Sequence, residues 1–226
     1  MLFNVHGGAW KAKDPSRVPP PSPCTQAHTL TSDMNIVNVG LSYRCIQNNG
    51  SLFKALSDIS DSIAYVLERH VGFKICPSQI GIMGSSAGAL LSAIIANRMA
   101  VCGLYIGING IYNVYNKGPG RFPRRSVLAD FGIPPKAEPL MDASPLFGIP
   151  ESPPPTLLLH GEFDTTIHWM QSFLYGKAIA RRGGYVKTVL VANAAHNLGK
   201  RDERNFKLTI EKIKQHIRLF SPCQDR

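Results

Sequence analysis

The sequence lacks the features of several protein classes. No apolar run approaches the roughly 18 residues that a membrane-spanning helix needs. The apolar start, Met1 to Val5, is too short for a secretory signal and has no basic flank. The five cysteines are widely spaced, with no C-x-x-C pair and no metal-ligand spacing, which favours reduced thiols. We therefore expect a soluble, cytoplasmic protein without stable membrane insertion.

Acidic residues are also scarce. The chain has 25 Lys and Arg against 15 Asp and Glu, a formal net charge of +10. Such a surplus can attract anionic partners, but no aromatic-interleaved basic segment or nucleic-acid motif accompanies it. We interpret the charge as a solvated basic face and exclude nucleic acid as a partner. The 226 residues, 44% of them hydrophobic, fit one globular domain spanning 1–226.

Short β-rich runs alternate with helical stretches along the chain, a pattern typical of the α/β class with a mostly parallel sheet and helices on both faces. Apolar spacing predicts helices over 52–70, with Ser51 as N-cap, over 87–99 and over 168–182. A closing helix places Phe206, Ile210, Ile213, Ile217 and Phe220 on one face. Strands are predicted over 2–5, 35–41, 79–83, 101–108, 156–160 and 186–191, and we expect the first two to lie inside the sheet.

Residues 111–155 break this alternation. The segment is rich in Gly, Pro and basic residues and has weak periodicity. Because a connection of this length is usually functional, we expect a small cap or substrate loop here.

Gly84-Ser85-Ser86-Ala87-Gly88 is a G-x-S-x-G motif between a predicted strand and a predicted helix. The sharp turn leaves no room for side chains at the flanking positions, which explains the two glycines. The following helix directs the positive end of its dipole at the serine and helps to hold a developing anion. The context therefore predicts Ser86 as a catalytic nucleophile.

A nucleophilic serine needs a base, and the base needs a carboxylate that orients it. In parallel α/β sheets with a serine nucleophile at a strand-to-helix turn, the order along the chain is Ser, then Asp or Glu, then His, each after a strand. Asp164 follows the strand 156–160 and His196 follows the strand 186–191, so we predict these two as partners. The competing acids are Glu162, Asp142 and Asp202. Of the other histidines, we expect His28, His70 and His216 at the surface and His168 at the start of a helix.

Acyl transfer also needs donors for the oxyanion. His6-Gly7-Gly8-Ala9-Trp10 follows the first strand and supplies a glycine-rich loop. We predict the backbone N–H groups of Gly8, Ala9 and Ala87 as donors, with Gly7 as a hinge, and His6 as a structural anchor. A metal site of His6, His160 and His196 matches no usual spacing, so neither a metal nor a cofactor is expected.

These motifs resemble the small esterases of the α/β-hydrolase superfamily, in particular the carboxylesterase and isoprenylcysteine methylesterase-like group near the acetyl and feruloyl esterases. Hormone-sensitive-lipase-like enzymes and kynurenine formamidases are similar in motif. The resemblance rests on these segments: His6 to Trp10, Val39 to Arg44, Gly84 to Ala89, Asn109 to Asn113, Ser144-Pro145, His160 to Asp164, and His196. It implies a serine hydrolase that cleaves small carboxylic esters through an acyl-enzyme, without a cofactor.

The chain departs from the family pattern at two places. Ala9 stands where the family usually has a third glycine or small residue. Family members also have roughly two further strands before the oxyanion loop, so we expect a sheet that lacks these strands, with an exposed apolar edge that a homodimer could cover. Two alternatives stay open: an arylformamidase-type amidase with the same triad, and a truncated, catalytically weak binding protein. Specificity would lie in 11–31 and 111–155.

Overall fold

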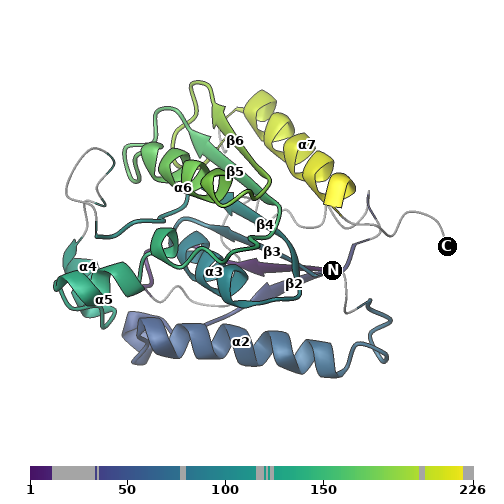
Figure 1. The fold of residues 1–226 in the computed structure, drawn as a ribbon, viewed down its shortest axis with the longest axis horizontal. Coiled ribbons are helices and arrows are strands. Elements are labelled where there is room, and N and C mark those ends of the chain that lie inside the picture. Colours follow the sequence, from purple (N-terminus) through teal and green to yellow (C-terminus); the bar gives the residue numbers. More distant parts are fainter. Residues whose placement is uncertain are drawn as a thin grey trace.

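The computed structural model describes residues 1–11, 34, 36–76, 80–115, 120, 122, 125–198 and 202–220. Its centre is a six-stranded sheet in the order β2-β1-β3-β4-β5-β6, in which every neighbouring pair is parallel (Figure 1). This arrangement confirms the predicted fold class. The strands are β1 (Leu2–Val5), β2 (Asn38–Leu41), β3 (Ile80–Ser85), β4 (Cys102–Ile108), β5 (Thr156–Gly161) and β6 (Val186–Val191).

Helices cover both faces of the sheet. The described helical elements are η1 (Ile46–Asn48), α2 (Leu52–Glu68), α3 (Ala87–Arg98), α4 (Arg125–Asp130), α5 (Ala137–Asp142), η2 (Pro145–Phe147), α6 (Met170–Arg181) and α7 (Glu203–Phe220). Helices α2, α3 and α6 contribute to the hydrophobic cluster on one face, and α7 contributes to the cluster on the other. In the described ranges, none of these helices has both the length and the apolar composition of a membrane crossing.

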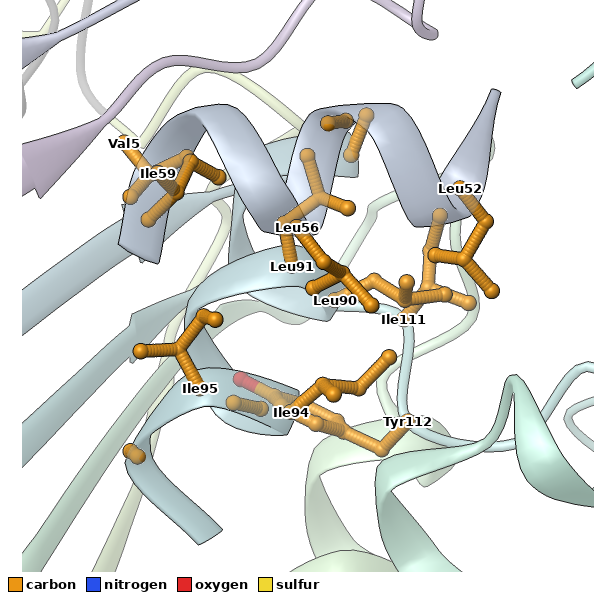
Figure 2. Close-up of a cluster of buried hydrophobic side chains, with 14 of the residues drawn as sticks. Val5, Leu52, Leu56, Ile59, Leu90, Leu91, Ile94, Ile95, Ile111 and Tyr112 are labelled. Atoms are coloured by element: carbon orange, nitrogen blue, oxygen red, sulfur yellow. The ribbon is translucent and has the colours of Figure 1, made fainter. Parts of the chain in front are cut away.

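Helix α3 lies between α2 and the sheet, and the sequences of the two helices reflect this. Helix α2 is amphipathic and buries one stripe, as predicted, whereas α3 is apolar around its whole circumference and is buried along ten consecutive residues, Ala87 to Ala96. Figure 2 shows Leu56 and Ile59 of α2 above Leu90 and Leu91 of α3. Ser51 caps α2 as predicted, because its side chain accepts a hydrogen bond from the Lys54 N–H.

The prediction that both early strands lie inside the sheet is wrong for the second. Strand β1 lies between β2 and β3, but β2 forms an edge of the described sheet. This strand begins at Asn38, later than predicted, and its four residues pair one to one with the four residues of β1. The order of the strands depends on contacts between distant segments, so local periodicity in the sequence does not predict it.

Residues 111–155, predicted as a cap or substrate loop, contain the short helices α4 and α5 and the turn η2. Buried side chains of this segment, including Leu128, Phe131 and Leu140, belong to the same hydrophobic cluster as α2 and α3. The N–H of Leu52 at the start of α2 donates to the Phe131 carbonyl at 2.9 Å. The described part of this segment therefore packs on the same face of the sheet as α2.

His216 is buried, contrary to the prediction that it lies at the surface. Only 2% of the residue is exposed, and its ring packs near Tyr185 and Phe220. Its Nε2 donates to the Pro155 carbonyl at 3.2 Å. Burial lowers the pKa of His216 to about 4; the bond to Pro155 opposes this shift, and the charge of Lys187 adds to it.

The neutral form of His216 makes the fold sensitive to mild acid. The unfolded chain takes up a proton at this residue below about pH 6.5 and the folded chain does so only near pH 4, so stability falls between these values as pH is lowered. Between about pH 7.5 and about pH 5 the unchanged protein should lose about 2 kcal/mol of stability through His216. The variant His216→Gln, which keeps an N–H donor, should not show this part of the loss. Urea unfolding at the two pH values measures this difference.

The control for this prediction is His168→Gln, since His168 is exposed. That variant should lose stability in acid as the unchanged protein does. An equal loss in His216→Gln would contradict the assignment of the effect to the buried imidazole.

Candidate active site

Three residues predicted for catalysis follow strands whose carboxyl ends share one edge of the sheet. Ser86 follows β3, Asp164 follows the end of β5, and His196 follows β6. Because these strands are parallel, their ends lie at the same edge, where open α/β sheets bind ligands.

Ser86 occupies a tight turn between β3 and α3. Its backbone has φ 53° and ψ −122°, a conformation that non-glycine residues rarely adopt. The Ser86 N–H donates to the Ile108 carbonyl at 2.9 Å, which ties the turn to the end of β4. A Cβ atom on Gly84 would lie 2.2 Å from Ser92 Oγ, and one on Gly88 would lie 2.3 Å from the Val5 carbonyl oxygen. Both glycines of the motif are therefore required by close packing.

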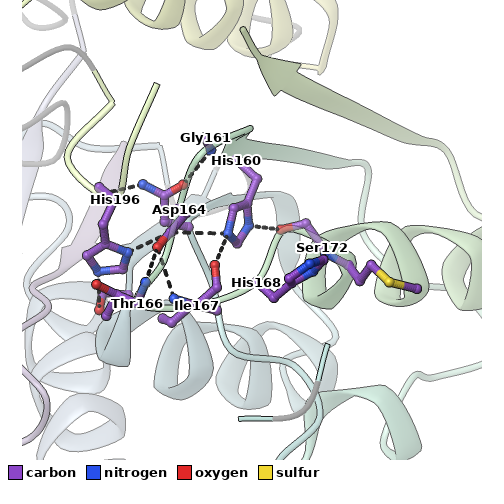
Figure 3. Close-up of polar contacts among 11 residues, drawn as sticks. His160, Gly161, Asp164, Thr166, Ile167, His168, Ser172 and His196 are labelled. Atoms are coloured by element: carbon purple, nitrogen blue, oxygen red, sulfur yellow. Dashed lines mark hydrogen bonds and ion pairs between the residues drawn. The ribbon is translucent and has the colours of Figure 1, made fainter. Parts of the chain in front are cut away.

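Ser86, His196 and Asp164 form a continuous chain of hydrogen bonds. His196 Nε2 lies 3.0 Å from Ser86 Oγ, and His196 Nδ1 lies 2.7 Å from Asp164 Oδ2 (Figure 3). The side chain of Asp164 is fully buried, whereas 22% of the His196 side chain is exposed. With Nδ1–H donating to the carboxylate, Nε2 is left to accept the Ser86 proton.

Further donors surround the Asp164 carboxylate. The N–H groups of Thr166 and Ile167 donate to Oδ1 at 2.8 and 2.9 Å. Burial by itself would raise the pKa of Asp164, but the hydrogen bonds from His160, His196 and the Ile167 N–H outweigh it and hold this pKa well below its usual range. The carboxylate is therefore ionised near neutral pH and can stabilise a charged His196.

His160, for which the sequence suggests no role beyond a metal ligand, is a neighbour of the predicted triad. Its side chain is buried, with Nε2 3.2 Å from Asp164 Oδ2 and 2.8 Å from the Ile167 carbonyl oxygen. Its Nδ1 lies 2.7 Å from Ser172 Oγ (Figure 3). With Nε2 protonated, His160 shares this N–H between the Ile167 carbonyl and Asp164 Oδ2, and Ser172 then donates to Nδ1. The spacing His160-x-x-x-Asp164 at a strand end is a signal that could have indicated this contact.

The loop after β1 lies against the turn that carries Ser86. A Cβ atom on Gly7 would lie 3.0 Å from the Ser86 Cβ. Gly8, Ala9 and Trp10 have positive φ values of 127°, 55° and 56°, so the loop holds an unusual backbone path. Ala87, the third predicted donor, is the first residue of α3, and the first N–H groups of a helix have no partner within it.

Contacts from the segment after β2 anchor this loop. The ring of His6 stacks on Tyr43 at 4.5 Å, and the Tyr43 hydroxyl donates to the His6 carbonyl at 3.0 Å. Burial raises the pKa of Tyr43, so the hydroxyl stays protonated and remains a donor. The Ile46 N–H donates to the Trp10 carbonyl at 2.8 Å, and the Trp10 ring stacks on Phe131.

The rival acids have other contacts. Glu162 accepts from the Asn193 N–H at 3.0 Å, and Asp202 accepts from the Arg204 N–H at 2.9 Å at the start of α7. Asp142 is exposed at the end of α5. His168 precedes α6 and accepts from the Met170 N–H, while His28 lies outside the described residues.

Across the ranges that the structure describes, no three His, Cys, Asp or Glu side chains are arranged to hold a metal ion. His6 lies with Tyr43, whereas His160 and His196 both contact Asp164.

Comparison with known proteins supports the fold assignment. Residues 1–102 match the BD-FAE family. No curated protein matches the chain. Among solved structures, a truncated carbohydrate esterase from gut microbiota is 19% identical, with a TM-score of 0.78, and the match covers 96% of this chain and 85% of that one.

Two further structures are similar. Thermogutta terrifontis esterase 2, phosphonylated by sarin, is 18% identical, with a TM-score of 0.81 and coverage of 99% of this chain and 85% of that one. Carboxyl esterase 2 from the mycorrhizal fungus Tuber melanosporum is 17% identical, with a TM-score of 0.80 and coverage of 97% and 78%. By its sheet, its helices and these likenesses, the chain has the fold of the α/β-hydrolases.

Proposed function

We propose that the protein is a serine hydrolase that cleaves carboxylic esters of small molecules through an acyl-enzyme. The observation that carries this proposal is the hydrogen-bond chain from Ser86 Oγ through His196 to the buried Asp164 carboxylate. The match of residues 1–102 to BD-FAE and the likeness to structures named as esterases support the same reaction class.

In this mechanism Ser86 Oγ attacks the ester carbonyl while His196 Nε2 takes the hydroxyl proton. His196 then gives that proton to the leaving alcohol, and the acyl group stays on Ser86. Water, activated by the same imidazole, attacks the acyl-enzyme and releases the acid. Asp164 keeps the proton of neutral His196 on Nδ1 and stabilises the imidazolium that forms in each step.

The oxyanion of the tetrahedral intermediate needs donors close to Ser86. We assign this role to the N–H groups of Gly8, Ala9 and Ala87, with Gly7 as the hinge of the loop. The contact distance between Gly7 and Ser86 supports the assignment, because a side chain at Gly7 would press against the nucleophile. The first turn of α3 adds the positive end of its dipole at the same point.

We assign substrate selection to residues 111–155, as a cap of the single domain, and to residues 11–31. The packing of Trp10 of the oxyanion loop on Phe131 of this cap supports a link between the two. Residues 12–31 lie outside the described residues. Homodimerisation through the exposed sheet edge stays a prediction, which gel filtration tests.

Replacing Ser86→Ala should lower turnover of p-nitrophenyl acetate and butyrate by about 10⁴-fold or more, since no other group supplies the nucleophile. Labelling by a fluorophosphonate should disappear together with turnover. The matched control is Ser85→Ala, which changes the neighbouring hydroxyl and should keep both. A folded, unchanged protein that neither turns over esters nor reacts with the fluorophosphonate would favour the binding-protein alternative.

The variants Asp164→Asn and Glu162→Gln together test which of the two acids orients His196. Asparagine cannot hold His196 in the required tautomer, so kcat should fall by about 10³- to 10⁴-fold. Glu162→Gln should stay near the unchanged rate, because Glu162 contacts the Asn193 backbone and not the imidazole. Steady-state kinetics on one ester measures both, and a larger loss in Glu162→Gln would reverse the assignment.

An arylformamidase-type amidase would use the same three residues. The ratio of kcat/KM for an aryl formamide to kcat/KM for an ester of the same aryl group separates the two activities. A ratio well below one supports the esterase.

A further inference from the structure

Asn109 is a buried polar residue to which the proposed mechanism assigns no role. It follows the last residue of β4 directly and is only 2% exposed. Its backbone has φ 47°, in the left-handed region where asparagine is several times more common than most residues. Its own N–H donates to the Leu159 carbonyl at 2.8 Å, which fixes its backbone against β5.

The side-chain amide of Asn109 joins two loops that are far apart in sequence. Its Oδ1 accepts from the Gly161 N–H at 2.9 Å, and its Nδ2 donates to the His196 carbonyl. The first bond is made to the end of β5, where the turn to Asp164 begins. The second is made to the backbone of the proposed base itself.

These two loops also touch each other beside Asp164 (Figure 3). The Gly161 carbonyl accepts from the Asp164 N–H at 3.2 Å, and the Phe163 N–H donates to the Ala194 carbonyl at 2.9 Å. A Cβ atom on Gly161 would lie 2.4 Å from the Ala194 carbonyl oxygen. The acid turn and the base loop therefore meet at Gly161, the residue that Asn109 binds.

The nucleophile turn is connected to the same point. The Ile108 carbonyl, which accepts from the Ser86 N–H, belongs to the residue directly before Asn109. A movement at Asn109 would consequently change the positions of Gly161 and His196 relative to Ser86.

We propose that Asn109 is a positioning residue for the triad, whose amide holds the His196 backbone at the distance from Ser86 and Asp164 that proton transfer requires. The inference rests on the proposed function. A carboxamide fits this role because one end accepts from Gly161 while the other donates to His196. An aspartate of the same shape would turn an acceptor towards the His196 carbonyl, and an aliphatic side chain would leave both buried groups unpaired.

The test uses Asn109→Gly, since glycine accepts the left-handed backbone and keeps the N–H bond to Leu159 while it loses the amide. Asn193→Gly is the matched control. Asn193 is also left-handed, at φ 57°, and precedes His196 in the same loop, but its side chain is exposed. We expect kcat of Asn109→Gly to fall by about 10- to 100-fold with KM changed by less than about 2-fold. Asn193→Gly should keep both.

Two readouts separate positioning from a loss of folded protein. Rates are divided by the concentration of folded protein. Circular dichroism measures this concentration at a temperature well below each variant's Tm. We expect a far-downfield proton resonance from the His196 Nδ1–H, assigned by its loss in His196→Gln. It should shift or broaden in Asn109→Gly and stay unchanged in Asn193→Gly.

A lower Tm with unchanged kcat per folded molecule and an unchanged resonance would overturn the positioning role, as would equal losses in the two glycine variants. Failure of the proposed function gives a different result, because the unchanged protein and Asn193→Gly would then both lack ester turnover. In that case the resonance in Asn109→Gly still decides whether Asn109 positions His196.

Discussion

The short distance between helix α3 and the sheet is the constraint on which the site depends. A Cβ atom at Gly88 would lie 2.3 Å from the carbonyl oxygens of both Val5 and His6, so the helix begins in direct contact with the end of β1. The chain has to turn from β3 into this helix within a single residue, and Ser86 takes the unfavourable backbone conformation. The same approach brings the loop at Gly7 against Ser86. Ser86, the start of α3 and the glycine loop are thus placed together by one packing contact.

A buried charge sets the second requirement. The Asp164 side chain is fully buried, and a carboxylate without partners there would cost several kcal/mol. Donors from the backbone at Thr166 and Ile167 satisfy one oxygen, and His160 and His196 approach the other. The backbone bonds fix the carboxylate in place, so that it can in turn fix the imidazole of His196. His160 and Ser172 extend this arrangement one layer further from Ser86.

Local pattern predicted much of this molecule, and its failures have physical causes. The strand and helix periods predicted most elements to within two residues, because burial on one face imposes a period that sequence records directly. The edge position of β2 was missed because strand order depends on which distant strand pairs with β1. The burial of His216 could have been inferred, since it lies three residues after Ile213 and four before Phe220 on the apolar side of α7.

The residues that surround the triad are harder to predict. Asn109 binds Gly161 and His196, which lie 52 and 87 positions away along the chain. Nothing in the local sequence marks an asparagine with such partners, and a motif identifies Ser86 only because strand, turn and helix adjoin it. The three predicted triad residues meet in space because parallel strands end at one edge, while the contacts that hold them follow from the folded arrangement as a whole.

The second face of the sheet has a consequence for how the protein is made. Among the described elements, the cluster on that face joins Leu2, Met83, Ile106 and Leu157 to Ile210, Ile213 and Ile217 of α7. Synthesis proceeds from the amino end, so Ser86, Asp164 and His196 are all polymerised before the helix that covers this apolar surface. The nascent polypeptide therefore carries an uncovered hydrophobic sheet face until its final described helix emerges. Exposed apolar surface of this kind favours aggregation while folding is incomplete.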